Sequence, residues 1–184
     1  MKKRAIRYYG LVLILCVMAL AAPVVFAEDA SDGGAAGITA AQTDRDLELK
    51  ACGTTDVKFS AKTDKKQHPL AEPQAGMAIV YVLRPTMMGN KVQTKLAMDG
   101  NWLGVNRGKN YFYFIAEPGE HNFCSKAENS SILTMTLEPD KTYFLQQKIQ
   151  MGLMKARTSL VAMTEEEGQD KLADCHLSIF EEKR

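Results

Sequence analysis

Apolar and polar residues alternate along much of the second half of the chain. The stretch AIVYVL, residues 78–83, is instead almost continuously apolar and rich in β-branched side chains, which is typical of a strand buried on both faces. Shorter β-like runs follow it, separated by turns that contain Pro or Gly. The pattern predicts further strands at 92–98, 102–105, 111–115, 121–126, 132–137, 142–149 and 159–163.

Glycine and proline turns connect these strands in the segment MDGNWLGVNRGKNYFYFIAEPGEH, residues 98–121. Asp99-Gly100 is a strong hairpin signal, because Gly accepts positive φ at no steric cost. Pro118-Gly119 marks a later turn, since Pro presets φ and Gly follows it. We interpret the glycines as turn residues, because a phosphate-binding loop would need a strand-to-helix context and no helix follows.

A short helix is predicted after the last strand. Thr164 is a candidate N-cap and Glu167 follows three residues later, which is the spacing of a capping box. The helix should run to about Ala173, and Gly168 should weaken it by up to about 1 kcal/mol relative to Ala. A single meander cannot bury its apolar face alone. The predicted fold is therefore all-β: an antiparallel β-sandwich of about seven to eight strands with one short C-terminal α-helix.

The composition changes along the chain and predicts its organisation. Residues 28–76 form a flexible or extended N-terminal segment, because the small, polar run 31–37 cannot bury enough apolar surface to offset chain entropy. A short edge strand is possible within it at 56–61. The β-sandwich domain is expected at 77–177, and 178–184 is expected to be a polar tail.

The amino terminus has the pattern of a secretory signal peptide. Four basic residues lie in the first nine positions, an apolar run covers 11–26, and cleavage is expected after Ala27. The signal peptide is thus 1–27, and the protein is expected to be exported to the periplasm or cell envelope. The alternative is an uncleaved membrane anchor, although the apolar run is short for a spanning helix. Lipidation at Cys16 is disfavoured because a large residue, Leu15, precedes it, so membrane association is possible but lacks a good lipobox.

Removal of the signal changes the charge balance. The whole chain has 23 basic and 22 acidic residues; the signal carries four of the basic ones and no acid, which leaves 19 against 22, a net charge of −3. Such a balance provides no electrostatic surface for nucleic acid. The remaining 157 residues are enough for one domain with a substantial core.

Several short motifs occur in combination: 78–85 (AIVYVLRP), 98–100 (MDG), Gly104, Tyr111-Phe112, 118–121 (PGEH), 150–152 (QMG) and 165–168 (EEEG). In this combination the chain resembles the bacterial family of domains of unknown function DUF2846, over about 76–177, and it is also similar to PEGA-type β-modules. The resemblance implies an exported or envelope-attached β-sandwich with no established activity and no catalytic residues. Members are often lipoproteins with a cysteine directly after the signal, whereas Cys52 lies well past the expected cleavage site.

The expected mature chain has three cysteines, and export favours disulfides. We expect Cys52 to pair with Cys175, because a bridge between them would join both ends of the sandwich. Cys124 lies within a predicted strand and is expected to be a small buried hydrophobic residue. The two other pairings remain open.

Catalytic and metal-binding patterns are weak. The histidines His68, His121 and His176 are scattered, without the close His or Cys spacing of a zinc site. Four methionines could be soft Cu(I) ligands but are more simply hydrophobic residues (Met87, Met88, Met151 and Met154). No Gly-x-Ser-x-Gly elbow is present. We therefore expect no cofactor and no enzymatic activity.

Two groups of residues are candidate binding surfaces. Strand alternation places Phe112 and Phe114 on one face, expected to be core, and Tyr111 and Tyr113 on the other. Trp102, Tyr111 and Tyr113 could then form an exposed platform for a sugar or a protein. The alternative is that the tyrosine face packs with Trp102 or is half-exposed.

The second candidate surface is the connection between two predicted strands at 151–157, which is both apolar and basic. Its candidate binding residues are Met151, Leu153, Met154 and Arg157. Loops carry function more often than cores do, and such a tip could contact a protein or a bilayer, with ordinary hairpin packing as the alternative.

These patterns together favour a non-catalytic, exported cell-envelope module that binds a protein or glycan or has a structural role. The alternatives are an enzyme that acts on envelope polymers and a periplasmic metal or redox protein. The ligand and the partner are not specified by the sequence.

Overall fold

The computed structural model describes residues 33–66, 68, 70–72, 74–151 and 156–183, with side chains described from residue 42. The expected signal peptide, 1–27, lies outside these residues. The elements are α1 (Gly33–Cys52), β1 (Lys58–Asp64), β2 (Ala78–Arg84), β3 (Thr94–Met98), β4 (Asn101–Asn106), β5 (Asn110–Ala116), β6 (Gly119–Lys126), β7 (Ser130–Leu137), β8 (Thr142–Met151), β9 (Ala156–Met163), α2 (Glu165–Ala173) and β10 (His176–Lys183). In this part of the chain no helix is long and apolar enough to cross a membrane.

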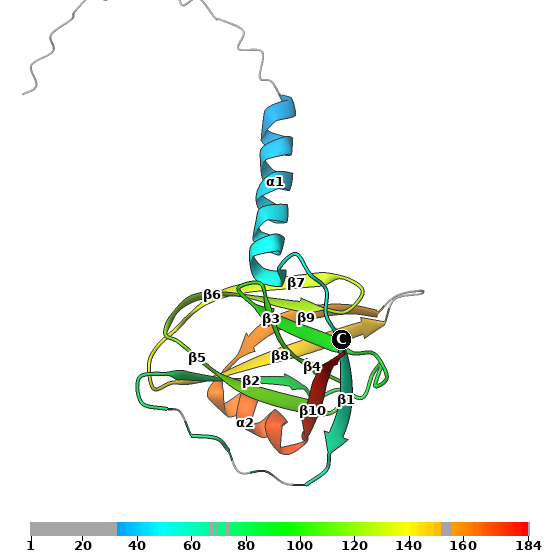
Figure 1. Cartoon of the computed structure of the whole chain (residues 1–184), viewed down its shortest axis with the longest axis vertical. Helices are drawn as coiled ribbons and strands as arrows, with labels where there is room; N and C mark the ends of the chain where they lie inside the picture. The colour runs from blue at the N-terminus through cyan, green and yellow to red at the C-terminus, as the bar shows by residue number, and fades with distance from the viewer. Residues whose placement is uncertain (1–32, 67, 69, 73, 152–155, 184) are drawn as a thin grey trace, which may run out of the picture. The chain divides into compact units, whose positions relative to one another are not determined.

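The strands form two sheets, as Figure 1 shows. The six-stranded sheet has the order β1-β10-β5-β2-β8-β9, and the four-stranded sheet has the order β4-β3-β6-β7. Most neighbours are antiparallel, but β2 pairs with β8 and β10 pairs with β5 in parallel. After β2 the chain adds β3 and β4 to the smaller sheet, returns to the larger sheet with β5, and builds β6 and β7 of the smaller sheet before β8. These crossings between the sheets allow β8 to pair with β2 in parallel. The predicted β-sandwich is confirmed, with these two parallel pairs added.

The main core lies between the sheets. Every residue of β2 is buried, as its continuous apolar run predicted. Val80, Val82 and Phe112 of the larger sheet share one apolar cluster with Phe123 of the smaller sheet. Each fully buried side chain of this size stabilises the fold by about 1.5–3 kcal/mol. Phe114 also packs against this cluster, so the predicted phenylalanine face of β5 is confirmed as core.

Helix α2 covers the other face of the six-stranded sheet. Thr164 accepts a hydrogen bond from the Glu167 backbone N–H, and Glu167 reaches back to the Thr164 N–H, which confirms the capping box. Leu172 of α2 packs with Tyr81 and Phe144 of the sheet. Only glycine fits at position 168 without a shift of its neighbours, because an added Cβ would lie 2.1 Å from Cγ of Phe144. The residue expected only to weaken the helix is therefore what lets α2 approach the sheet closely.

The predicted domain limits of 77–177 are too narrow at both ends. The expected edge strand exists as β1 and pairs with β10, which occupies most of the predicted polar tail. Phe180 is the reason for this pairing, because its ring packs edge-on against Phe59 and Phe112. Three charged residues at 181–183 obscured the apolar side of this last strand in the sequence.

The N-terminal segment is also corrected, because α1 replaces most of the predicted flexible linker. The strong helix formers between residues 40 and 50 outweigh the glycines at its start, each of which costs about 1 kcal/mol. The helix ends at Cys52, and Gly53 follows it with a φ of +75° and an N–H bond to the carbonyl of Leu49, which is typical of a left-handed helix terminus. Ala51 and Cys52 of the last turn are buried.

The expected Cys52–Cys175 disulfide is wrong: Cys52 pairs with Cys124, and Cys175 is a free, buried thiol. Cys124 packs with Ala51 and Ala97 in a cluster at the end of α1, on the smaller sheet. Cys175 instead packs with Tyr111 and Tyr81 on the α2-covered side of the larger sheet. Cys52 and Cys175 thus pack against different sheets, and no bridge joins them.

Candidate functional site

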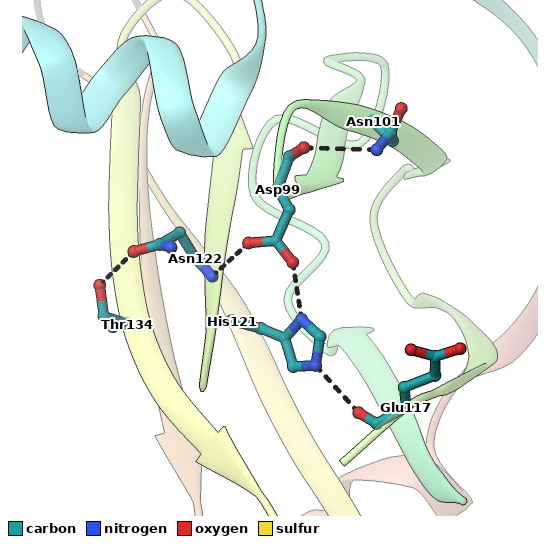
Figure 2. Close-up of polar contacts among 6 residues, drawn as sticks. All are labelled: Asp99, Asn101, Glu117, His121, Asn122 and Thr134. Carbon is teal, nitrogen blue, oxygen red and sulfur yellow. Dashed lines mark hydrogen bonds and ion pairs between the residues drawn. The ribbon is translucent and has the colours of Figure 1, made fainter. Parts of the chain in front are cut away.

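The first polar group of interest joins the β3–β4 turn to β6 (Figure 2). His121 Nδ1 lies 2.6 Å from Oδ2 of Asp99, and its Nε2 lies 2.9 Å from the backbone oxygen of Glu117. The other carboxylate oxygen of Asp99 accepts the N–H of Asn122 at 2.9 Å. Asp99 has a φ of +49° and Gly100 a φ of +81°, as the predicted Asp-Gly hairpin requires. Two motifs predicted as separate turns are therefore in direct contact.

The protonation of this pair follows from its partners. Both ring nitrogens of His121 face oxygen acceptors, so the imidazolium is the form that satisfies both. Burial alone would lower the pKa of His121, but the hydrogen bonds to Asp99 and Glu117 outweigh burial and raise it. Burial alone would raise the pKa of Asp99, but the Asn122 N–H and His121 outweigh that and lower it. With no free ring nitrogen, His121 is arranged to hold two segments together and not to act as a general base.

A cavity of about 330 Å³ lies beside α2, on the outer face of the six-stranded sheet. It is enclosed by the connection after β1, by the C-terminal end of α2 and by the start of β10. Tyr111, Leu172 and Cys175 are its buried members. The described residues around it are Lys65, Lys66, His68, Leu70, Tyr111, Gln169, Leu172, Ala173, Cys175 and His176.

Hydrogen bonds hold the segment after β1 in place beside this cavity. One carboxylate oxygen of Asp64 accepts the N–H of Lys66 at 2.9 Å, and the other lies 3.2 Å from Nε2 of His68. The Lys66 N–H, with His68, lowers the pKa of Asp64. Further along, the Tyr81 hydroxyl accepts the N–H of Ala71 at 2.7 Å. The cavity wall is thus tied to the end of β1 and to the central strand β2.

The thiol and the phenol of the cavity floor stay protonated at neutral pH. Burial raises the pKa of the Cys175 thiol to about 12, an effect that Asp174 reinforces and Lys109 opposes. Burial also raises the pKa of Tyr111. A neutral, buried thiol is a poor nucleophile, because the thiolate is the reactive form. Among the residues with described positions, no group of three potential metal ligands was found.

The proposed aromatic platform is not assembled. Tyr111 is buried at 6% exposure, whereas Tyr113 is 41% exposed, and both lie on the larger sheet. Trp102 lies on β4 of the smaller sheet, where its indole N–H donates to the carbonyl of Thr55 at 2.6 Å. The Nζ of Lys95 lies 5.0 Å from the Trp102 ring centroid, and that of Lys126 lies 6.0 Å from it. The candidate platform of Trp102, Tyr111 and Tyr113 is therefore not formed. Trp102 is hydrogen-bonded on the smaller sheet, and Tyr111 is buried on the larger one.

The second predicted surface is described only at its ends. Met151 is 55% exposed at the end of β8, and Arg157 is exposed near the start of β9. Leu153 and Met154 lie outside the described residues. The turn at Gly89 packs beside Met151, since an added Cβ would lie 3.2 Å from its sulfur. Binding of a protein or a bilayer by this surface stays a prediction.

Sequence reasoning missed the residues that line the cavity, apart from Tyr111. Lys65, Lys66 and His68 lie in the N-terminal segment 28–76, which was predicted to be flexible or extended. His176 follows Cys175 directly after the predicted helix. This adjacency was the one local pattern in the sequence that pointed to the cavity. Nothing in the spacing indicated that two histidines more than a hundred residues apart would border one cavity.

The fold and these two groups define a two-sheet β-sandwich with a hydrogen-bonded hairpin contact in one sheet and a helix-covered cavity on the other. Residues 74–159 match the family model of DUF2846, which is described as a protein of unknown function. A protein of Haemophilus influenzae described as uncharacterized is similar, with 25% identity over 134 residues, 72% of this chain and 79% of that protein. No solved structure matches the chain.

The Asp99–His121 contact and the cavity differ in their position relative to residues 74–159, which match the family model. Asp99 and His121 both lie inside 74–159, whereas every described cavity residue except Tyr111 lies outside it. The hairpin contact therefore belongs to the shared sandwich. The cavity is built from the elements that flank it: the segment after β1, α2 and β10.

Proposed function

We propose that this protein is an exported, non-catalytic binding module of the bacterial cell envelope. The N-terminal pattern of a basic segment, an apolar run and a small-residue cleavage site supports export. The Cys52–Cys124 disulfide agrees with an oxidising compartment, where such bonds persist. The partner would be an envelope protein or glycan, which the module contacts without transforming it.

The cavity beside α2 is the observation that carries the binding role. Its volume is at the lower end of the range for small-ligand sites, and it combines a buried apolar floor with polar groups around the opening. Tyr111 and Cys175 both have raised pKa values and remain neutral, so neither is activated for chemistry. An apolar floor with polar groups at the rim can orient one end of a partner and exclude water around it.

The test begins with the full chain, expressed in a Gram-negative host and purified from the periplasmic fraction. An intact mass that lacks residues 1–27 would support export and cleavage after Ala27. Retention of the full-length chain in the membrane fraction would contradict cleavage and favour the uncleaved anchor.

The binding role is then tested with an NMR screen of neutral, anionic and cationic fragments. Shifts at the amides of Leu172, Ala173 and Cys175 would locate ligands in the cavity. Ala173→Phe, at an exposed lining position, should fill the space and abolish those shifts, while Gln74→Phe serves as an exposed control that does not line it. Absence of any cavity shift with all fragments, or chemical conversion of a bound fragment, would overturn the proposal.

A further inference from the structure

We infer that the cavity beside α2 recognises a carboxylate attached to a compact apolar group. This inference rests on the proposed binding function and names the chemistry of its ligand. The two sources of such a group are a free organic acid and the C-terminal residue of a peptide. Both present one anionic end and one apolar body, and the cavity has a separate region for each.

The apolar body is matched by the cavity floor. Leu172 is 9% exposed, Tyr111 is 6% exposed and Cys175 is 8% exposed, so together they form a largely dry surface. Leu70, which is 55% exposed, provides an apolar side chain at the rim. A ligand that covered Leu70 while contacting the floor would remove apolar surface from water at about 25 cal/mol per Å². This favours an aliphatic or aromatic group over a sugar ring, whose hydroxyls would lack partners there.

The anionic end is matched by the charges at the opening. The lining residues with described positions include Lys65 and Lys66 and no carboxylate. The nearest acidic group on the same segment, Asp64, already accepts the Lys66 N–H and contacts His68. Two ammonium groups on adjacent residues can contact both oxygens of one carboxylate, whereas an amine would meet like charge.

The C-terminal end of α2 opposes an anion, because its carbonyls carry partial negative charge. Those carbonyls already have donors. The carbonyl of Leu172 accepts the N–H of Cys175 at 3.0 Å, and that of Lys171 accepts the N–H of Asp174 at 3.3 Å. The carboxylates of Asp64 and Asp174 also oppose an anion, since they raise the pKa values of Tyr111 and Cys175 on the cavity floor. Lys65 and Lys66 line the cavity itself, whereas neither carboxylate does, so the lysines favour an anion at the opening.

The experiment compares matched probes on the full-length protein as purified from the periplasm. Hexanoate, 1-hexanol and hexylamine share one tail and differ in charge, and acetyl-Ala-Leu acid and its C-terminal amide do the same for a peptide end. Titrations followed by amide NMR should show hexanoate or the peptide acid shifting Leu172, Ala173 and Cys175 at the lowest concentration. Hexanoate alone would identify a free acid as the source, and the peptide acid alone would identify a chain terminus.

The lysines are tested by the double variant Lys65→Ala/Lys66→Ala. Two exposed ion pairs predict about a 2- to 30-fold weaker affinity for the acid, with no change for hexanol. Lys91→Ala/Lys141→Ala removes the same charge from exposed positions outside the cavity and should leave affinity unchanged. Because the substituted residues are exposed, folding should be retained, which the amide spectrum checks directly.

Two results would overturn the inference, and they differ from failure of the binding function. Equal binding of the alcohol, the amine and the acid would show that the cavity holds ligands without preference for an anion, so the proposed function would stand alone. An unchanged acid affinity in Lys65→Ala/Lys66→Ala would remove the assigned anion contacts. Cavity shifts with none of the probes and none of the screened fragments would overturn both proposals.

Discussion

His121 Nδ1 lies 2.6 Å from Oδ2 of Asp99, and this contact fastens the β3–β4 turn to the beginning of β6. The Asp99 N–H also donates to the carbonyl of Asn122 at 2.9 Å, which continues the β3–β6 ladder beyond its last pair, Met98 with Phe123. Side chain and backbone thus hold the same two segments. The arrangement explains why the motifs Asp-Gly and Pro-Gly-x-His occur in one chain.

This contact predicts a pH-dependent contribution to stability. The folded-state pKa of His121 is raised above its ordinary value of about 6.5, so the contribution is fully present below that value and is lost as pH rises through the folded pKa. The pKa of Asp99 is lowered, so its contribution is present above the unfolded value and is lost as pH falls through the folded one. Asp99→Asn should therefore cost more at pH 5.5 than at pH 9.

Urea unfolding of Asp99→Asn and His121→Gln at both pH values measures this difference. Since Asp99 is 37% exposed at the side chain, the pair should contribute about 1 kcal/mol or less. His68→Gln breaks an exposed histidine–aspartate contact of the same type and is the matched control, with a smaller effect. A double-mutant cycle with no coupling at pH 5.5 would contradict the assignment.

Gly168→Ala should destabilise the protein although it improves helix propensity. Propensity alone predicts a gain of about 1 kcal/mol, but the new Cβ would lie 2.1 Å from Cγ of Phe144 and force α2 away from the sheet. Overpacking of this kind costs about 1–3 kcal/mol. Gln169→Ala, on an exposed position of the same helix, controls for propensity. If the free energy of unfolding rises in Gly168→Ala, the close packing against Phe144 is wrong.

The cysteine pairing predicts which thiol reacts. In unreduced protein, Cys175 should be alkylated slowly in the folded state, because it is buried and its thiol pKa is raised to about 12. Denaturation without reductant should expose Cys175 and leave Cys52 and Cys124 unlabelled, as peptide mass mapping would show. Reduction should lower the free energy of unfolding by about 4 kcal/mol for a bridge across 72 residues. Labelling of Cys52 without reduction would exclude this bridge.

The features that could be predicted from the sequence are those set by patterns within a few residues. The fully apolar run of β2, the Asp99-Gly100 hairpin and the capping box at Thr164 follow from patterns within a few residues, and the structure confirms each. The disulfide partner of Cys52, the pairing of β1 with β10 and the cavity around Cys175 depend on which sheet and which face each segment joins. Strand alternation specifies two faces but not what covers them. Tyr111 was correctly placed on the face opposite Phe112, but the exposed platform considered for it does not form, because Tyr111 is buried.

Arg84 should stabilise the fold strongly, because it is a fully buried cation at the end of the central strand β2. Its guanidinium donates to the backbone carbonyls of Met88, Gly89 and Val92, which shapes the turn after the strand. Burial lowers the pKa of Arg84 to about 10, so it stays charged at neutral pH. Its contacts are with carbonyl oxygens, so removing it would take a donor from three acceptors of one turn. Of these, the carbonyl of Gly89 would keep the N–H of Val92 at 2.8 Å.

Arg84→Met should therefore cost about 3–5 kcal/mol, in the range found when one partner of a buried charged contact is removed. Urea unfolding measures the loss, and amide exchange of residues 88–92 should accelerate before the rest of the sheet is affected. Arg107→Met, at an exposed position, is the control and should change stability by less than about 0.5 kcal/mol. If Arg84→Met unfolds at the same urea concentration as the unaltered protein, the turn does not depend on the guanidinium, and apolar packing at this end of β2 would account for its order.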